Sequence, residues 1–316
     1  MDATAAEKAK ILVAAFGSVA AAARETGIPR RTLRDWLGDK AKRRPSAVRT
    51  EDVRGCVPPR IEAKVDNSSV LVLPDLHAPY AHPDAVAFLC AVRDAIGATR
   101  CVSVGDETDF HALSFHDSDP DLDSAGRELE SARVFLRRLE REFPVLELVE
   151  SNHGALPFRR AHAHGMPSRL VRSYREILFG ETDENGDSIV VNGRGALWRW
   201  SPQLRIELPG NRVAFVRHTY GADIVRVARE NGACLIQGHH HGLLEARHAT
   251  LLHGSVWALS VGCLIDPTHS AFNYGRASRI QPALGCGAIV GGEPIAVKMP
   301  LDEHGRWTGK LPIFGA

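Results

Sequence analysis

Short apolar runs alternate with amphipathic segments along most of the chain after Val70. Four runs are typical of β-strands because each is short, apolar and followed by polar residues. They are VLVLPD (70–75), CVSVGD (101–106), VLELVESN (145–152) and ACLIQG (233–238). Apolar positions recur at helical spacing in the segments between them, residues 82–97, 124–143 and 221–232. This alternation predicts the α/β class, with βαβ units around a largely parallel sheet.

The last part of the chain has a different pattern, because strand-like runs follow one another without helical segments. These runs cover residues 249–264, 285–292 and 294–300. They predict a second, mixed sheet near the end of the chain.

The N-terminal part differs from the rest in composition and predicts a separate small domain. Residues 1–45 hold ten basic and five acidic residues, whereas the remainder is slightly acidic. Residues 46–68 are rich in proline and polar residues without sustained periodicity, which is typical of a linker. We therefore predict an all-α domain over 1–45, a linker over 46–68 and a larger α/β domain over 69–316.

The stretch AAAARETGIPRRTLRDWL has the spacing of a helix-turn-helix module. Ala23 would lie where two helices cross, Gly27 would permit the turn, and Ile28, Leu33 and Trp36 would form core contacts. The exposed side of the second helix would then carry Arg30, Arg31 and Arg34, which are candidates for binding DNA. The alternative is a module that only packs or dimerises.

Bulk composition excludes several classes of protein. The chain has 316 residues, 44% hydrophobic and 24% charged, and a net charge of +1, which by itself does not indicate a nucleic-acid partner. The six cysteines have no metal-binding or disulfide spacing and predict reduced thiols. Charged residues interrupt the Ala-rich N-terminus, so we expect neither a signal peptide nor a membrane span, and a cytoplasmic protein.

Side chains that bind metals follow each strand-like run, including a fifth run, RVAFVRH (212–218). The candidate ligands are Asp75, His77, Asp106, Asn152, His218, His239 and His241. Because ligands of open α/β sheets bind beyond the carboxyl ends of the strands, we expect these side chains to converge. Oxygen and imidazole donors without thiolates suit manganese, and also iron, zinc or nickel. Seven ligands exceed the needs of one ion, so we predict two divalent metal ions that share a carboxylate.

The ordered motifs DLH, GDET, SNHG, the histidine of VRHTY, and GHHH resemble those of the calcineurin-like metallophosphoesterases. The resemblance implies a four-layer α-β-β-α sandwich and a metal-dependent phosphoric ester hydrolase. It implies that one ion is held by Asp75, His77, Asp106 and His241. It implies that the other is held by Asp106, Asn152, His218 and His239. His153 would be the catalytic imidazole, and His240 would face away.

Two positions depart from the family pattern. Ser151 stands where the family has a glycine, and Gly154 stands where it has an acidic residue, so we expect a differently shaped loop around His153. Neither departure removes a ligand. A further His-x-His pair, His162 and His164, does not end an apolar strand, so we interpret it as a solvated loop or a surface that faces the substrate.

These features favour a two-metal phosphodiesterase or nuclease that its N-terminal module delivers to DNA. Helix-turn-helix modules fused to phosphoesterase domains also resemble proteins of bacteriophages and prophages. One alternative is a phosphatase or phosphodiesterase that acts on small nucleotides or phosphoproteins. Another is a DNA-binding regulator whose metal-binding domain has lost catalysis. The sequence leaves the oligomeric state open.

Overall fold

The computed structural model divides the chain into two units, Met1–Ala63 and Lys64–Ala316. In the second unit the structure describes residues 69–115, 121–182, 188–190, 197–252, 254–272 and 281–312. In the first it describes residues 7, 10, 13–15, 18–26, 28, 33 and 37. The predicted linker, residues 46–68, lies outside these residues.

The second unit contains strands, α-helices and short 3-10 helices in alternation. Its strands are β1 (Ser69–Leu73), β2 (Arg100–Ser103), β3 (Leu146–Val149), β4 (Gly180–Thr182), β5 (Ser188–Val190), β6 (Trp198–Ser201), β7 (Leu204–Leu208), β8 (Arg212–Val216), β9 (Cys234–Gln237), β10 (Leu244–Leu251), β11 (Gly254–Val261), β12 (Gly285–Val290) and β13 (Glu293–Lys298). Its α-helices are α4 (Ala85–Ile96), α5 (Ala125–Glu142), α6 (Leu156–Ala163), α7 (Tyr174–Phe179) and α8 (Ile224–Asn231). Its 3-10 helices are η2 (His111–Leu113), η3 (Ser168–Leu170), η4 (Pro209–Asn211) and η5 (Ser270–Phe272).

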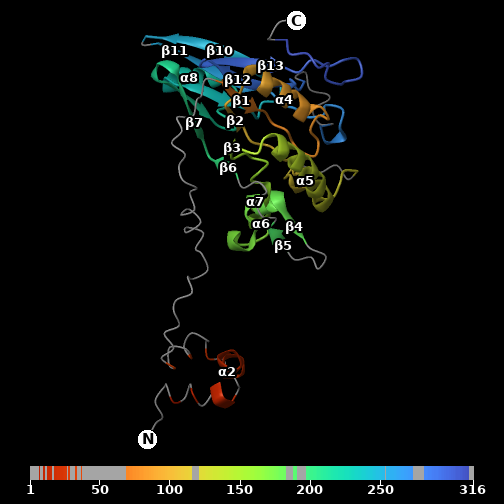
Figure 1. The fold of residues 1–316 in the computed structure, drawn as a ribbon, viewed down its shortest axis with the longest axis vertical. Helices are drawn as coiled ribbons and strands as arrows, with labels where there is room; N and C mark the ends of the chain where they lie inside the picture. Colours follow the sequence, from red (N-terminus) through yellow and green to blue (C-terminus); the bar gives the residue numbers. More distant parts are fainter. Residues whose placement is uncertain are drawn as a thin grey trace. The chain divides into compact units, whose positions relative to one another are not determined.

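Two mixed sheets contain most of these strands, and β4 and β5 form a separate antiparallel pair (Figure 1). The first has the strand order β13-β12-β1-β2-β3-β6, in which β1, β2, β3 and β6 are parallel and β12 is antiparallel to both of its neighbours, β1 and β13. The second has the order β10-β11-β9-β8-β7, with β8, β9 and β11 parallel and the outer strands antiparallel. The predicted α/β class is confirmed.

Strand β1 shows why the first sheet is covered on both faces. Its sequence SVLVL is almost uniformly apolar, as expected of a parallel strand buried on both sides. Leu71 and Leu73 belong to one buried cluster with helices α4 and α5. Val70 and Val72 belong to a second cluster that includes residues of β8, β9 and β11, so the two sheets pack face to face. Gly287 allows this approach, because a Cβ there would overlap a side chain of the second sheet.

Helices pack against both sheets. Helix α4 contacts β1 and β12, and α5 contacts α4 and α7, while α8 contacts β9, β10 and β11. In α5, Leu136 and Leu139 are fully buried, which agrees with the helical apolar spacing seen in the sequence. Within the described part of the chain, no helix combines the length and apolar composition needed to cross a membrane. Of the described cysteines, Cys234, Cys263 and Cys286 are buried and free.

The prediction from the sequence assigned some of the strands to the wrong sheet. We expected the four runs that alternate with helical segments to lie in one sheet, but the last of them, β9, belongs to the second sheet. Conversely, β12 and β13, expected in the second sheet, extend the first. Strand periodicity reports burial but not the pairing partner, and here the β12-β13 hairpin returns to pair with β1.

The first unit contains helix α2 (Val19–Thr26) and a small apolar cluster. Ala22 and Leu33 are buried there, with Ala23 and Ile28 packed against them. Leu33 and Ile28 therefore make the core contacts predicted for them, whereas Ala22 rather than Ala23 occupies the fully buried position. Other predicted residues of this module lie outside the described residues, namely Gly27, Arg30, Arg31, Arg34 and Trp36.

Candidate metal centre

The loops after β1, β2, β8 and β9 bring together six of the seven candidate ligands, and the loop after β3 brings His153 beside them. The first sheet contributes the loops after β1, β2 and β3, and the second sheet contributes those after β8 and β9. Because the sheets pack face to face, these loops meet at one end of the sandwiched strands. Three groups of side chains have ligand atoms within 4.8 Å of one another. They are Asp75, His77 and His241; Asp106, His218 and His239; and His77, Asp109 and His153.

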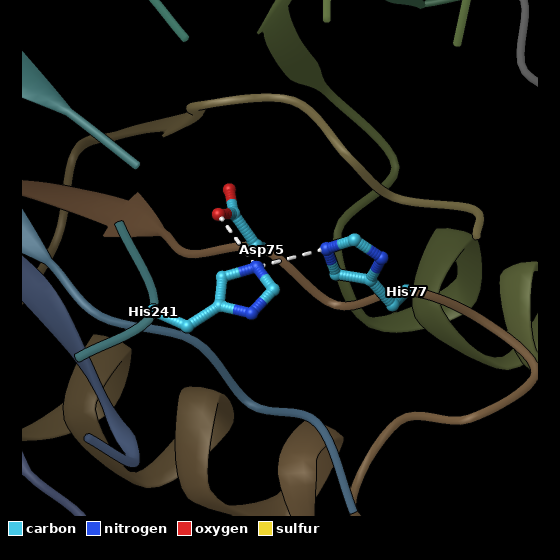
Figure 2. A group of neighbouring side chains, drawn as sticks. All are labelled: Asp75, His77 and His241. Atoms are coloured by element: carbon cyan, nitrogen blue, oxygen red, sulfur yellow. Dashed lines mark hydrogen bonds and ion pairs between the residues drawn. The ribbon is translucent and has the colours of Figure 1, made fainter. Parts of the chain in front are cut away.

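The first group joins the loop after β1 to the loop after β9 (Figure 2). The Nε2 atoms of His77 and His241 lie 3.0 Å apart. Nε2 of His241 lies 3.4 Å from Oδ2 of Asp75, a carboxylate with no exposed surface. Figure 2 shows the imidazole of His241 between the other two side chains, with its interactions directed to both. Two imidazole nitrogens and one carboxylate oxygen, all potential metal ligands, thus lie close together.

The second group joins the loop after β2 to those after β8 and β9. Nε2 of His218 lies 3.2 Å from Oδ2 of Asp106 and 3.2 Å from Nδ1 of His239. The backbone N–H of His239 donates a hydrogen bond of 2.6 Å to Oδ2 of Asp75. This bond connects the second group to the first.

Asp106 links the two groups through a single oxygen atom. Its Oδ2 lies 3.5 Å from Nε2 of His77 and 3.2 Å from Nε2 of His218. Its other oxygen accepts a hydrogen bond of 3.2 Å from the backbone N–H of His153. The side chain of Asp106 is buried, so Oδ2 is available to both groups but not to bulk solvent. This is the position expected of a carboxylate shared by two ions.

Hydrogen bonds on the far side of two imidazoles orient them toward these groups. Nδ1–H of His77 donates to Oδ1 of Asp109 at 2.6 Å, and Nδ1–H of His218 donates to the carbonyl oxygen of Val104 at 2.9 Å. With the proton on Nδ1, each Nε2 carries a lone pair that points into its group. Metal-binding histidines commonly have such partners, which fix the tautomer and the ring orientation.

The donor set fits divalent cations. The lone pair of His218 Nε2 faces a carboxylate oxygen of Asp106, and two such acceptors repel each other unless a cation or a proton lies between them. Oδ1 of Asp75 is buried and has no hydrogen-bond partner among the described residues. All members of these groups offer nitrogen or oxygen and none offers a thiolate, which suits manganese, iron, zinc or nickel.

The electrostatics of the second group show how strongly it attracts positive charge. Burial lowers the pKa of His218, but the carboxylates of Asp106 and Asp75 outweigh burial and raise it to about 9. Burial likewise raises the pKa of Asp106, yet the facing histidines His218 and His153 hold it well below its usual range. Without a metal, the group therefore takes up a proton to neutralise its carboxylates.

The backbone at three predicted ligands adopts a conformation that side chains rarely favour. His77, Asp106 and His239 have φ angles of 50°, 47° and 64°, in the left-handed region. Such conformations cost free energy and persist where the surroundings enforce them, often at functional sites. All three residues belong to the groups of the candidate metal centre.

His153 belongs to the third group, contacts the second through Asp106, and lines a cavity of about 690 Å³. Its Nδ1–H donates to the carbonyl oxygen of Asp109, so Nε2 is left for other partners. Burial lowers its pKa, but the carboxylates of Asp106 and Asp109 raise it above the ordinary histidine value. Asn152 is exposed and lines the same cavity. His240 belongs to none of the three groups formed by the described residues.

Sequence reasoning missed Asp109. Its carboxylate holds His77 at 2.6 Å and lies 3.5 Å from Nδ1 of His153 and 3.8 Å from Nδ1 of His111. The available signal was its position three residues after Asp106 in the same loop, GDETD. By contrast, His162 and His164 are exposed, as predicted, although they lie at the end of helix α6 and not in a loop.

The two departures from the family pattern shape the turn before α6. Oγ of Ser151 accepts a hydrogen bond of 3.2 Å from the backbone N–H of Gly154 and so closes the turn that contains His153. A Cβ at Gly154 would lie 3.1 Å from the hydroxyl oxygen of Tyr174 and 3.2 Å from Oγ of Ser151. This space is tight for a larger side chain, so the loop is built around a small residue.

A comparison of the sequence with models of known protein families gave no match. A comparison with curated protein sequences also gave no match. The interpretation of the site therefore depends on its own geometry.

Proposed function

We propose that this chain is a phosphoric ester hydrolase that uses two divalent metal ions, with manganese as the first choice. The observation that carries the proposal is the position of Asp106, whose Oδ2 lies 3.5 Å from His77 and 3.2 Å from His218. A carboxylate oxygen between two groups of imidazole ligands can be shared by two ions, and two-ion sites are common in enzymes that cleave phosphate esters. The motif resemblance to calcineurin-like metallophosphoesterases supports the same proposal, as do two facing sheets with helices packed on them, which we interpret as the four-layer sandwich of that family.

The residues divide into two ligand sets and one catalytic side chain. Asp75, His77, Asp106 and His241 would hold one ion. Asp106, Asn152, His218 and His239 would hold the other. Two bound dications would supply the Lewis acidity that activates water and neutralises charge on the phosphoryl oxygens.

His153 would act on the ester rather than on the ions. The carboxylates of Asp106 and Asp109 raise its pKa and so favour the protonated imidazole, and Asp109 fixes its orientation. A protonated imidazole beside the scissile bond can donate a proton to the leaving oxygen. We therefore assign His153 as the general acid.

We further propose that the substrate is a phosphodiester, with DNA as the first choice. The support is the helix-turn-helix spacing of the N-terminal module together with the buried contact of Ala22 and Leu33, which is consistent with a small helical core. Arg30, Arg31 and Arg34 would contact the phosphate backbone.

Metal analysis and hydrolysis assays test the proposal. Purified protein should contain a transition metal by elemental analysis, and Mn²⁺ should switch on cleavage of bis(p-nitrophenyl) phosphate or of single- or double-stranded DNA, with loss in chelator. Asp106→Ala should lose both metal and activity because it removes the shared ligand. His153→Ala should keep the metal and lose about 10²–10⁴-fold in turnover.

One control variant and two contrary outcomes complete this test. His164→Ala changes an exposed histidine at the C-terminal end of α6, the helix that follows the turn with His153. This variant should behave as wild type. Equal turnover in His153→Ala and wild type would refute the general acid. Folded wild-type protein that binds no ion and cleaves no phosphate ester with Mn²⁺ would refute the function itself.

A further inference from the structure

The cavity beside His153 is larger than a phosphate group needs. Its volume of about 690 Å³ lies within the range of sites that enclose small organic molecules. His153 and Asn152 from the candidate metal centre line it, and so do Phe115 and Arg159. The group esterified to the scissile phosphate therefore has room to contact residues beyond the metal ligands.

Hydrogen bonds from two other helices hold the segment that leads to Phe115. The buried carboxylate of Glu128 accepts hydrogen bonds from the backbone N–H groups of His111 (2.6 Å) and Ala112 (3.0 Å). The guanidinium of Arg160 donates to the carbonyl oxygen of Leu113 at 2.7 Å. These bonds hold η2 and the residues after it in one position, which reduces the entropy lost when a ligand binds.

Arg159 contributes a positive charge to the lining of the cavity. Its guanidinium lies 5.0 Å from the ring centre of Phe115, and in the part of the chain that the structure describes it forms no ion pair with a carboxylate. By contrast, Arg160, which lies 4.3 Å from the same ring, uses its donors on backbone carbonyls. The stacked ring positions Arg159 at the cavity without neutralising it.

The charges around the cavity favour an anion at Arg159. The carboxylate of Asp109 also lines the cavity, but it accepts a hydrogen bond from His77. A guanidinium offers a planar set of donors that matches a phosphate group. Because the proposed metal centre already accounts for the scissile phosphate, the anion at Arg159 is a different group.

We propose that Arg159, positioned by Phe115, binds a second phosphate of the substrate, adjacent to the one that is cleaved. This inference rests on the proposed function. It specifies the substrate class as a nucleotide chain in which the phosphates of two neighbouring nucleotides are bound, in preference to an isolated phosphodiester. Arg159 is thus a residue that determines specificity.

The test compares substrates that differ by one phosphate. Hydrolysis of thymidine dinucleotide is measured with Mn²⁺, with and without a 5′-phosphate on the dinucleotide. Wild type should show a kcat/KM about 10–100-fold higher for the phosphorylated form, and Arg159→Gln should reduce this ratio to about 3 or less. Arg159→Lys should restore part of the ratio, because it returns the charge without the planar donors.

A binding measurement gives a readout that does not depend on turnover. Calorimetry compares thymidine 3′,5′-bisphosphate with thymidine 3′-monophosphate, and the extra affinity of the bisphosphate should disappear in Arg159→Gln. Arg229→Gln is the matched control, because Arg229 is an exposed arginine at the end of α8 that precedes β9. It should keep the wild-type ratio in both measurements.

The outcomes separate the two proposals. If wild type cleaves both dinucleotides and Arg159→Gln keeps the same ratio, the second-phosphate site is wrong while the hydrolase function stands. If wild type cleaves neither dinucleotide nor any other phosphate ester, the function is wrong, and calorimetry still decides whether Arg159 binds the second phosphate. Equal affinity of both ligands for wild type would overturn the site.

Discussion

Replacing Asp109 should weaken metal binding although Asp109 is not itself a predicted ligand. The carboxylate accepts a hydrogen bond of 2.6 Å from Nδ1 of His77 and is 3% exposed, so solvent cannot replace it. Partners of this kind raise the basicity of the imidazole and fix its tautomer, and their loss costs about 10–100-fold in metal affinity. These factors correspond to about 1.4–2.8 kcal/mol of binding free energy.

Two substitutions separate the charge of Asp109 from its hydrogen bond. Asp109→Asn keeps an oxygen that can accept the proton of His77, so we expect a loss of about tenfold. Asp109→Leu removes the acceptor and should approach about 100-fold. The loss should fall on one of the two ions, because His218 is oriented by the carbonyl oxygen of Val104 and not by Asp109.

Calorimetric titration of metal-free protein with Mn²⁺ measures both affinities. Thermal melting in chelator confirms that each variant is folded before titration. Asp94→Asn serves as the control, because this aspartate is on the surface and 67% of its side chain is exposed. Wild-type affinity for both ions in Asp109→Leu would show that Asp109 does not position His77, and the assignment would be abandoned.

Three other substitutions test the packing and electrostatics around the centre. Gly238→Ala should lower the free energy of unfolding by about 1–3 kcal/mol and weaken Mn²⁺ binding, because its Cβ would overlap Oδ1 of Asp75; urea unfolding and metal titration measure both effects. Burial raises the pKa of Glu128 from 4.5 to about 7, so the folded state holds a proton there that the unfolded state has lost. The free energy of unfolding should therefore fall by up to about 3 kcal/mol as the pH rises from about 4.5 to about 7, and this part of the pH dependence should be missing in Glu128→Gln. Leu136→Ala should lower the free energy of unfolding in urea by about 2–5 kcal/mol, because the side chain is fully buried in the core against the first sheet. A smaller loss would mean that neighbouring side chains move to fill the space left by the leucine.

Local sequence patterns predicted the elements that carry the site. The run at β1 and the helical spacing of α5 are visible in the sequence because burial repeats with the period of the local backbone. Asp75 and His218 were selected as ligands because each follows an apolar run, and the structure places both in the centre. Such signals need no knowledge of distant parts of the chain.

The contribution of Asp109 and Arg159 could not be predicted in this way. Both are ordinary polar residues in the sequence, and their roles depend on which groups face them after folding. Asp109 matters because His77 presents Nδ1 to it at 2.6 Å. Arg159 matters because Phe115, which lies in a loop far from it in the sequence, stacks against it. No periodicity reports a contact of that kind.

The sequence by itself determined the α/β class and the residue types that follow the strands, since both depend on short-range order. Only the tertiary structure decided that β8 and β9 lie in a different sheet from β1 and β2, and that the oxygen of Asp106 lies between His77 and His218. The physical reason is that strand pairing and side-chain convergence are settled by competition among distant segments for the same partners, and that competition leaves no trace in the pattern of any one segment.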